Sequence, residues 1–231
     1  LKGDLLNRGK RSLAIDLKQA RGIETVLRLV EQADVLLEGF RPGVTERLGL
    51  GPAVCQARNA ALVYGRMTGW GQTGPLAPAA GHDINYLAQA GALDTIAKPG
   101  EEPRAPLNLL GDFGGGALYL AFGIAAALHE RNTSGKGQVV DAAIVEGTAS
   151  LMGMVAGAYQ SGSLKRGYEN NVLSGAAPFY RTYECADGRH IAIGSLEPQF
   201  YARFIEAMDL YAEAPEEEKV LFRATFTQEE E

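Results

Sequence analysis

Two side chains in this sequence combine an acid–base group with a setting that suits proton transfer. The first, His82, lies in Gly81-His82-Asp83, directly after a proline-containing loop and at the predicted start of a helix. A neighbouring carboxylate can hold such an imidazole in one tautomer, and the histidine then serves as a base near neutral pH. A histidine that only caps its helix would stand in the same place, so both interpretations stay open for this segment alone.

The second side chain, Asp112, lies in a glycine-rich segment, 111–116, directly before an apolar helix. A capping aspartate would account for Asp112. It would not account for the three consecutive glycines after Phe113, because glycine weakens a helix and lets a ligand approach the backbone. Free N–H groups at this helix start would also stabilise a developing oxyanion. Another carboxylate, Glu197, precedes Pro198 at a third predicted helix start, where it could simply favour the helix dipole.

Other motifs indicate less. The pattern Gly-x-Gly-x-x-Gly at 69–74 matches a dinucleotide-binding loop, but Pro75 follows where the helix that holds a pyrophosphate should begin. The sequence contains no P-loop motif. Three scattered histidines and two distant cysteines, Cys55 and Cys185, form no pattern of metal ligands. We therefore expect neither a metal ion nor a redox cofactor.

The composition is that of an ordinary globular chain. Of 231 residues, 46% are hydrophobic and 22% charged, which allows a sizeable core. The net charge of −6 argues against nucleic acid as the main partner. The most apolar run, 117–128, is shorter than the ~18 residues of a membrane-spanning helix, so we expect no membrane span. The unpaired cysteines favour a reducing compartment such as the cytoplasm.

The elements that must position these residues begin with a predicted parallel sheet. Apolar runs at 12–17, 35–37 and 61–67 predict strands, and helical spacing at 19–32 predicts a helix between the first two. Strand, helix and strand in succession form a βαβ unit. Ligands of such sheets bind beyond the carboxyl ends of the strands.

The rest of the chain divides into further elements. Helices are expected at about 81–90 and 112–130, and a strand at 138–140 precedes a long helix that ends near Tyr159. Strands at 178–184 and 190–193 and a helix at 197–208 indicate a second, smaller unit. We predict a large domain at 1–143, a linker helix at 144–177 and part of a small α+β domain at 178–231.

Six segments together resemble a known family: EGFRPGVTERLGLG (38–51), RMTGWGQTGP (66–75), GHDINY (81–86), NLLGDFGGG (108–116), SGKGQVVDAAI (134–144) and YECADGR (183–189). They are similar, in order and over nearly the whole chain, to the α-methylacyl-CoA racemases of the family III CoA-transferase superfamily. Members of this family are longer at both ends, so we expect that sequence is missing from both termini here.

The resemblance implies a fold and a reaction. Family members are interlocked homodimers, and each chain has a Rossmann-like large domain and a small domain. By motif, His82 and Asp112 are the two acid–base residues, and Glu197 from the partner subunit supports the histidine. Together they would interconvert (R)- and (S)-2-methylacyl-CoA through an enolate, in fatty acid and lipid metabolism. Coenzyme A is part of the substrate, and the enzyme would be cytoplasmic, or mitochondrial or peroxisomal in a eukaryote.

The resemblance also places the coenzyme A contacts, mostly at the predicted strand ends. These residues are Ile15, Asp16, Leu17, Lys18, Gly39, Phe40, Arg41, Arg47, Gly81, Asp83, Ile84, Asn85 and Tyr86. The sequence departs from the family at Ile15, where relatives carry a small residue.

Two other functions compete with the racemase. In a family III CoA-transferase, Asp112 would attack the thioester as a nucleophile, and no histidine base would be needed. The GHDINY segment together with Glu197 favours the racemase. The other alternative is a non-catalytic protein that binds coenzyme A.

Overall fold

A computed structural model describes residues 5–97, 101–164 and 171–208. The chain forms two compact units, one from residues 1–92 with 105–153, the other from 93–104 with 154–231. The domain boundaries proposed from the sequence, after residues 143 and 177, stay a prediction. The end of the small domain, 209–231, lies outside the described residues.

A three-stranded parallel sheet organises the first unit. Its strands are β1 (Val35–Glu38), β2 (Val63–Thr68) and β3 (Val139–Ala143), in the order β1-β2-β3. The central strand pairs Tyr64 with Leu36 on one side and with Val139 on the other. The predicted mixed α/β fold with a parallel sheet is therefore confirmed.

Helices flank this sheet and its connections. They are α1 (Ala20–Val30), α2 (Val44–Arg47), α3 (Pro52–Arg58), α4 (Asp83–Gln89), the π-helix η2 (Leu109–Leu118), α6 (Tyr119–Ser134) and α7 (Ile144–Leu151). A short 3₁₀ turn, η1 (Leu5–Asn7), precedes them.

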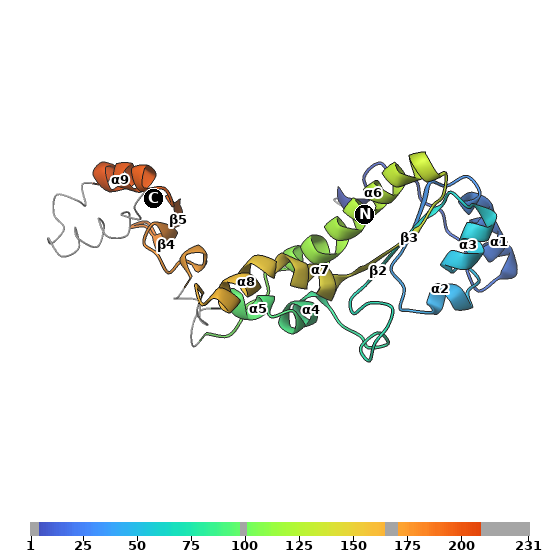
Figure 1. Ribbon diagram of the computed structural model, residues 1–231, viewed down its shortest axis with the longest axis horizontal. Coiled ribbons are helices and arrows are strands. Elements are labelled where there is room, and N and C mark those ends of the chain that lie inside the picture. The colour runs from blue at the N-terminus through green and yellow to red at the C-terminus, as the bar shows by residue number, and fades with distance from the viewer. Residues whose placement is uncertain (1–4, 98–100, 165–170, 209–231) are drawn as a thin grey trace. The chain divides into compact units, whose positions relative to one another are not determined.

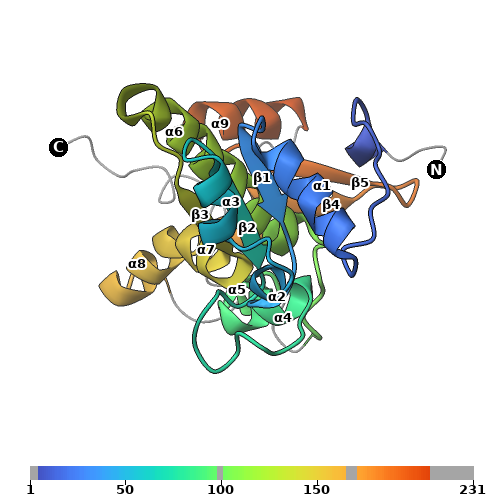
Figure 2. The same ribbon diagram turned by 90° about the vertical axis from the view of Figure 1, so that its right-hand side faces the viewer.

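Helices cover both faces of the sheet. Successive residues of β2 point to opposite faces, so the contacts of Tyr64 and Gly65 show which helices cover each face. Tyr64 is fully buried in a core cluster with Leu27 and Val30 of α1 and Cys55 of α3. On the opposite face, a Cβ at Gly65 would lie 2.9 Å from Ile124 of α6. Helices α1 and α3 therefore lie on one side of the sheet and α6 on the other (Figure 1 and Figure 2).

The strand predicted at 12–17 is wrong. Residues 12–16 have no regular secondary structure, and Leu17 begins a turn. The Asp16 carboxylate accepts the N–H of Lys18 at 2.9 Å, which closes this turn before α1 begins. A short side-chain hydrogen bond of this kind competes with strand pairing.

The glycine-rich segment also differs from its prediction. The cap of the helix is Asn108, not Asp112, and the backbone forms ten residues of π-helix that continue directly into α6. Close packing on α7 explains the glycines: a Cβ at Gly115 would lie 2.5 Å from Thr148 Oγ1, and a Cβ at Gly116 would lie 2.9 Å from Ile144.

Together η2 and α6 form a continuous helical stretch, Leu109–Ser134, of 26 residues, within which an 18-residue window has a mean hydropathy of 1.4. By length and composition alone, this stretch is long and apolar enough to cross a membrane, unlike the shorter run considered from the sequence. Such a helix is weak support for a span, because core helices pass the same test. Glycines of this stretch pack against three other elements: Gly111 against Asp83 of α4, Gly115 against Thr148 of α7, and Gly123 against Val140 of β3.

The second unit contains an antiparallel hairpin and a helix. Strands β4 (Tyr180–Glu184) and β5 (His190–Gly194) pair, and α9 (Pro198–Ala207) packs on them through Tyr201 and Ile205, which join Ala177 and Phe179 in a small core. The other helices among the described residues are α5 (Ala92–Thr95), α8 (Gly153–Ser161) and the 3₁₀ turn η4 (Val172–Ser174). The long helix predicted to end near Tyr159 is two helices, α7 and α8, with a turn at Met152.

Candidate active site

The start of α4 positions His82. Its backbone is extended (φ −134°, ψ 173°), so that the residue caps the helix and its side chain stays exposed. The Asn85 side chain reaches back and accepts the N–H of His82 at 3.0 Å. This hydrogen bond fixes the histidine backbone at the helix entrance.

Asp112 stands in the first turn of η2 and is half-buried. Its backbone N–H donates to Asp83 Oδ2 at 2.7 Å. Burial and the neighbouring charge of Asp83 raise the pKa of the Asp112 carboxyl, whereas a hydrogen bond from Asn108 and the charge of His82 lower it. Because Asp83 directly follows His82, its hydrogen bond with the Asp112 N–H joins the starts of α4 and η2 within the first unit, and it brings His82 and Asp112 into one cluster of charged groups.

Aromatic rings pack tightly beneath this cluster. The buried ring of Tyr86 meets Trp70 edge to face, with ring centroids 4.7 Å apart. A Cβ at Gly69 would collide with the Tyr86 ring. The first glycine of the dinucleotide-like pattern therefore serves packing, since only a hydrogen at that Cα admits the ring. Burial, and then the charge of Asp112, raise the pKa of Tyr86.

A buried ion pair holds the carboxyl ends of β1 and β2 together. Arg66 is 7% exposed, and its guanidinium donates to Glu38 at 3.1 Å and to Glu46 of α2 at 3.0 Å. The second carboxylate oxygen of Glu38 accepts the N–H of Phe40 at 2.8 Å. Sequence reasoning missed Arg66, although an arginine inside an apolar strand is itself a signal of a buried partner.

Three exposed cations predicted to bind coenzyme A belong to the same unit. Lys18 follows the turn at Asp16, Arg41 follows β1, and Arg47 ends α2. None of them makes an ion pair with any residue that the structure describes. Gly39 and Phe40, beside Arg41, are also exposed. Their roles in binding stay predictions.

The other predicted binding residues divide by exposure. Ile84 and Asn85 are exposed in the first turns of α4, whereas Asp83 and Tyr86 are buried. Ile15 is partly buried, and the Asp16 carbonyl next to it lies so close to Gly22 of α1 that a Cβ there would collide with it. The buried side chain of Asp83 is therefore not available for contact with a ligand at the surface.

Glu197 lies in the second unit. It caps α9, is exposed, and precedes Pro198 at the first helical position, as predicted. Its predicted support of His82 across a dimer stays a prediction.

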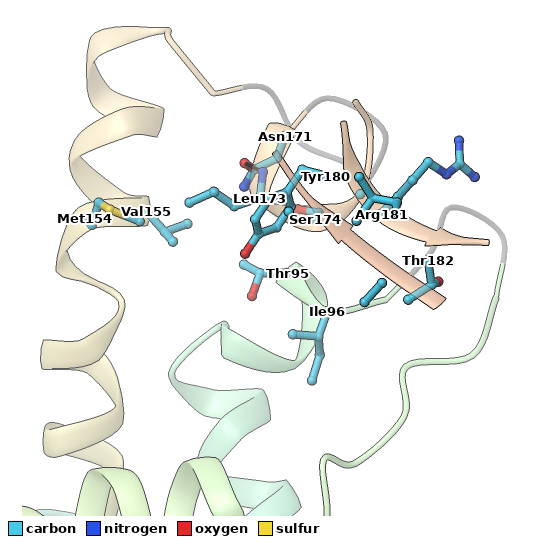
Figure 3. A pocket seen from close by; sticks show the side chains of 14 residues that line it. Thr95, Ile96, Met154, Val155, Asn171, Leu173, Ser174, Tyr180, Arg181 and Thr182 are labelled. Carbon is cyan, nitrogen blue, oxygen red and sulfur yellow. Dashed lines mark hydrogen bonds between the residues drawn. The ribbon is translucent and has the colours of Figure 1, made fainter. Parts of the chain in front are cut away.

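A cavity of about 620 Å³ lies in the second unit, between α8, the end of α5 and the β4–β5 hairpin. In Figure 3, Val155 and Leu173 point toward one another across it, and the Arg181 side chain points away. None of the predicted site residues lines this cavity. Within residues 5–97, 101–164 and 171–208, no group of three or more His, Cys, Asp or Glu side chains could hold a metal ion.

Comparison with known proteins gives a consistent picture. Residues 4–229 match the model of CoA-transferase family III. The chain is 50% identical to mouse α-methylacyl-CoA racemase over 91% of its own length, and 51% identical to the human racemase over 89%. A crystal structure of a CaiB/BaiF family protein from Brucella suis superimposes with a TM-score of 0.70 at 28% identity, covering 96% of this chain and 62% of that one. The chain spans just over half the length of the two racemases, 55% and 54%.

Proposed function

The chain belongs to CoA-transferase family III, and from this premise we propose that it interconverts (R)- and (S)-2-methylacyl-CoA thioesters. The observation that carries the proposal is the cluster of His82 and Asp112 at the adjoining starts of α4 and η2. The 50% identity to a racemase supports the same choice within the family. The enzyme is thus proposed to be an isomerase that uses general acid–base chemistry.

The reaction needs one base on each side of the α-carbon. One base takes the α-proton, and the electron pair of the broken C–H bond moves into the thioester to form an enolate. The conjugate acid of the other base then delivers a proton to the opposite side. Each positioned acid–base group contributes roughly 10²–10⁴-fold to the rate.

The enolate oxygen requires hydrogen-bond donors. The N–H of Asp112 does not serve, because Asp83 already accepts it. The N–H of Asn85 donates to the His82 carbonyl at 2.9 Å. The N–H groups of Asp83 and Ile84, at the first positions of α4 next to His82, have no acceptor within their own helix. We assign the donor role to this helix start, where the positive end of the helix dipole adds to the stabilisation.

Coenzyme A enters as part of the substrate, and we propose that its phosphates bind the three exposed cations. Arg41 and Arg47 follow the carboxyl end of β1, in the loop after it and at the end of α2, and Lys18 lies in the turn before α1. The carboxyl edge of a parallel sheet is the usual position of such ligands. Guanidinium groups pair with phosphate oxygens through two parallel hydrogen bonds.

We further propose that the active form is a homodimer in which Glu197 of one subunit supports His82 of the other. The similarity to mammalian racemases supports a mitochondrial or peroxisomal location and a role in fatty acid metabolism if the source is eukaryotic.

A CoA-transferase is the alternative within the family, because Asp112 alone would suffice as its nucleophile. Incubation of the wild-type protein with a single enantiomer of a 2-methylacyl-CoA in deuterated water separates the two. The racemase incorporates deuterium at the α-carbon and forms the other enantiomer. The transferase shows no exchange and forms an acyl–Asp112 adduct that hydroxylamine traps; this result would replace the racemase. Binding without either reaction would indicate a non-catalytic coenzyme A-binding protein.

A further inference from the structure

Asp83 is buried where its carboxylate has few partners. Only 7% of the residue is exposed. Its Oδ2 accepts the backbone N–H of Asp112 at 2.7 Å, and its Oδ1 has no hydrogen-bond partner among the residues that the structure describes. The carboxylate fits there because position 111 is a glycine: a Cβ at Gly111 would lie 2.5 Å from Asp83 Oδ2.

Burial of this carboxylate with so few partners does not favour folding, so the stability of the fold does not explain it. A buried carboxylate is costly unless a cation or several hydrogen-bond donors compensate it. No ion pair joins Asp83 to a described cation. The residue whose N–H Asp83 accepts, Asp112, itself carries a second carboxylate. Groups held in unfavourable electrostatic settings are concentrated at functional sites.

We propose that Asp83 is a positioning residue for Asp112. It fixes the backbone of Asp112 and sets a second negative charge beside the Asp112 carboxyl, so that Asp112 serves as acid as well as base. The inference rests on the proposed racemase function. It assigns to the Asp83 side chain a role other than contact with coenzyme A.

The two-base reaction explains the need for this charge. Asp112 must take a proton from one enantiomer and return one to the other. An ordinary aspartic acid, with a pKa near 3.9, is a weak base and almost never protonated at neutral pH. After burial, the charge of Asp83 is the main cause that raises the pKa of Asp112.

Other charged or titratable groups lie on the elements that pack against η2. They are His82 and Tyr86 from α4, Tyr119, His129, Glu130 and Arg131 from α6, Glu146 from α7, Tyr64 and Arg66 from β2, and Asp141 from β3. Of these, only His82 affects the pKa of Asp112, and it acts in the opposite direction. The charge of Asp83 is therefore the one to remove.

The variant Asp83→Asn tests the proposal, because the amide keeps an acceptor for the Asp112 N–H and loses the charge. The carboxyl carbon of Asp112 is titrated by ¹³C NMR in protein labelled at aspartate, with Asp112→Asn to assign its signal. We expect the midpoint of Asp112 above that of an ordinary aspartate in the wild type and lower in Asp83→Asn. The control Asp94→Asn removes an exposed charge from α5 and should leave the midpoint unchanged.

An unchanged midpoint in a folded Asp83→Asn variant would overturn the proposal. If that variant does not fold, the wild-type titration decides: an Asp112 midpoint at or below the ordinary value contradicts the proposal. A second reading is the pH profile of α-proton exchange with the enantiomer that Asp112 deprotonates. Its acidic limb should move to lower pH in Asp83→Asn, with a lower plateau. Wild-type protein without exchange at any pH would refute the racemase function, whereas exchange with an unmoved limb would refute only the role of Asp83.

Discussion

At the scale of single residues, the proposed role of Asp112 in catalysis and the stability of the fold favour different side chains at this position. Burial and the charge of Asp83 raise the pKa of its carboxyl in the folded protein above that in the unfolded chain. The folded state therefore binds this proton more tightly than the unfolded state does. The free energy of unfolding must then fall as the pH rises from the ordinary pKa through the raised one. Above that window the ionised carboxylate destabilises the fold.

Replacing Asp112 by Asn should consequently stabilise the protein at neutral pH while it abolishes racemisation. The gain should disappear below about pH 4, where the wild-type carboxyl is protonated in both states. Thermal unfolding of both proteins at a series of pH values measures the difference. Asp94→Asn, at an exposed site, should show no such pH-dependent gain. A variant that is less stable than the wild type at every pH would contradict this account of Asp112.

At the scale of elements, two arginines make ion pairs that should contribute differently to the free energy of unfolding. Arg66 pairs with Glu38, whose side chain is 4% exposed. Arg58 of α3 pairs with Glu24 and Glu31 at the surface, where all three side chains are at least 38% exposed. Removing one partner of a buried pair leaves an uncompensated charge, which costs about 3–5 kcal/mol. Exposed pairs contribute about 0–1 kcal/mol.

Urea unfolding should therefore separate Arg66→Met from Arg58→Met. We expect the free energy of unfolding to fall by about 3 kcal/mol or more in Arg66→Met and by less than about 1 kcal/mol in Arg58→Met. Adding Glu38→Gln to Arg66→Met should restore part of the loss, because the buried charge is then gone. Equal losses in the two single variants would show that the Arg66 pair does not hold the ends of β1 and β2.

Local patterns predicted most of these elements. Apolar runs located β1 and β2, and Pro198 after Glu197 located the start of α9. The strand predicted at 138–140 overlaps β3, which extends further, to Ala143. Local patterns failed to predict the structure of 12–17, because a strand needs a partner strand that a local pattern does not identify. There, the Asp16 side chain closes a turn instead. They also failed at the start of η2, where packing of Gly115 against Thr148 supports a π-helix that glycine propensity alone disfavours.

The candidate site was predictable only in part. Residue types and motifs pointed to His82 and Asp112, and the hydrogen bond from the Asp112 N–H to Asp83, the residue after His82, joins the two segments. Their catalytic roles stay predictions. The buried carboxylate of Asp83 and the pairing of Arg66 with Glu38 did not follow from the sequence. Both depend on contacts between residues about 28 or 29 positions apart, which only the assembled sheet and helices create.

At the scale of the whole molecule, a binding experiment tests whether coenzyme A binds at the carboxyl edge of the sheet. Arg47→Ala should weaken binding roughly tenfold at low salt, which corresponds to about 1.4 kcal/mol. The loss should shrink at high salt, where the charge attraction is already screened. Titration calorimetry with coenzyme A measures both. Arg28→Ala, on the exposed side of α1, is the control and should bind as the wild type does. Unchanged affinity of Arg47→Ala at low salt would contradict the assignment.

The proposed dimer makes its own prediction. An inactive Glu197→Ala chain and an inactive His82→Ala chain, co-expressed, should regain activity, because one site of each heterodimer then carries both defects and the other neither. Random pairing would restore about a quarter of the wild-type sites. Assay of the co-purified mixture against each parent measures this. An active monomer in sedimentation, or a mixture as inactive as its parents, would rule the shared site out.

The central claim is that His82 and Asp112 are separate bases on opposite sides of the α-carbon. Deuterium uptake into each pure enantiomer of a 2-methylacyl-CoA, measured for His82→Ala and Asp112→Ala, tests it most directly. Each variant should lose at least about 10²-fold in racemisation and still exchange the proton of one enantiomer with retention. The preferences should be complementary, and His82, by family resemblance, should serve the S form. If either variant still racemises at the wild-type rate, or if both prefer the same enantiomer, the two-base account is wrong.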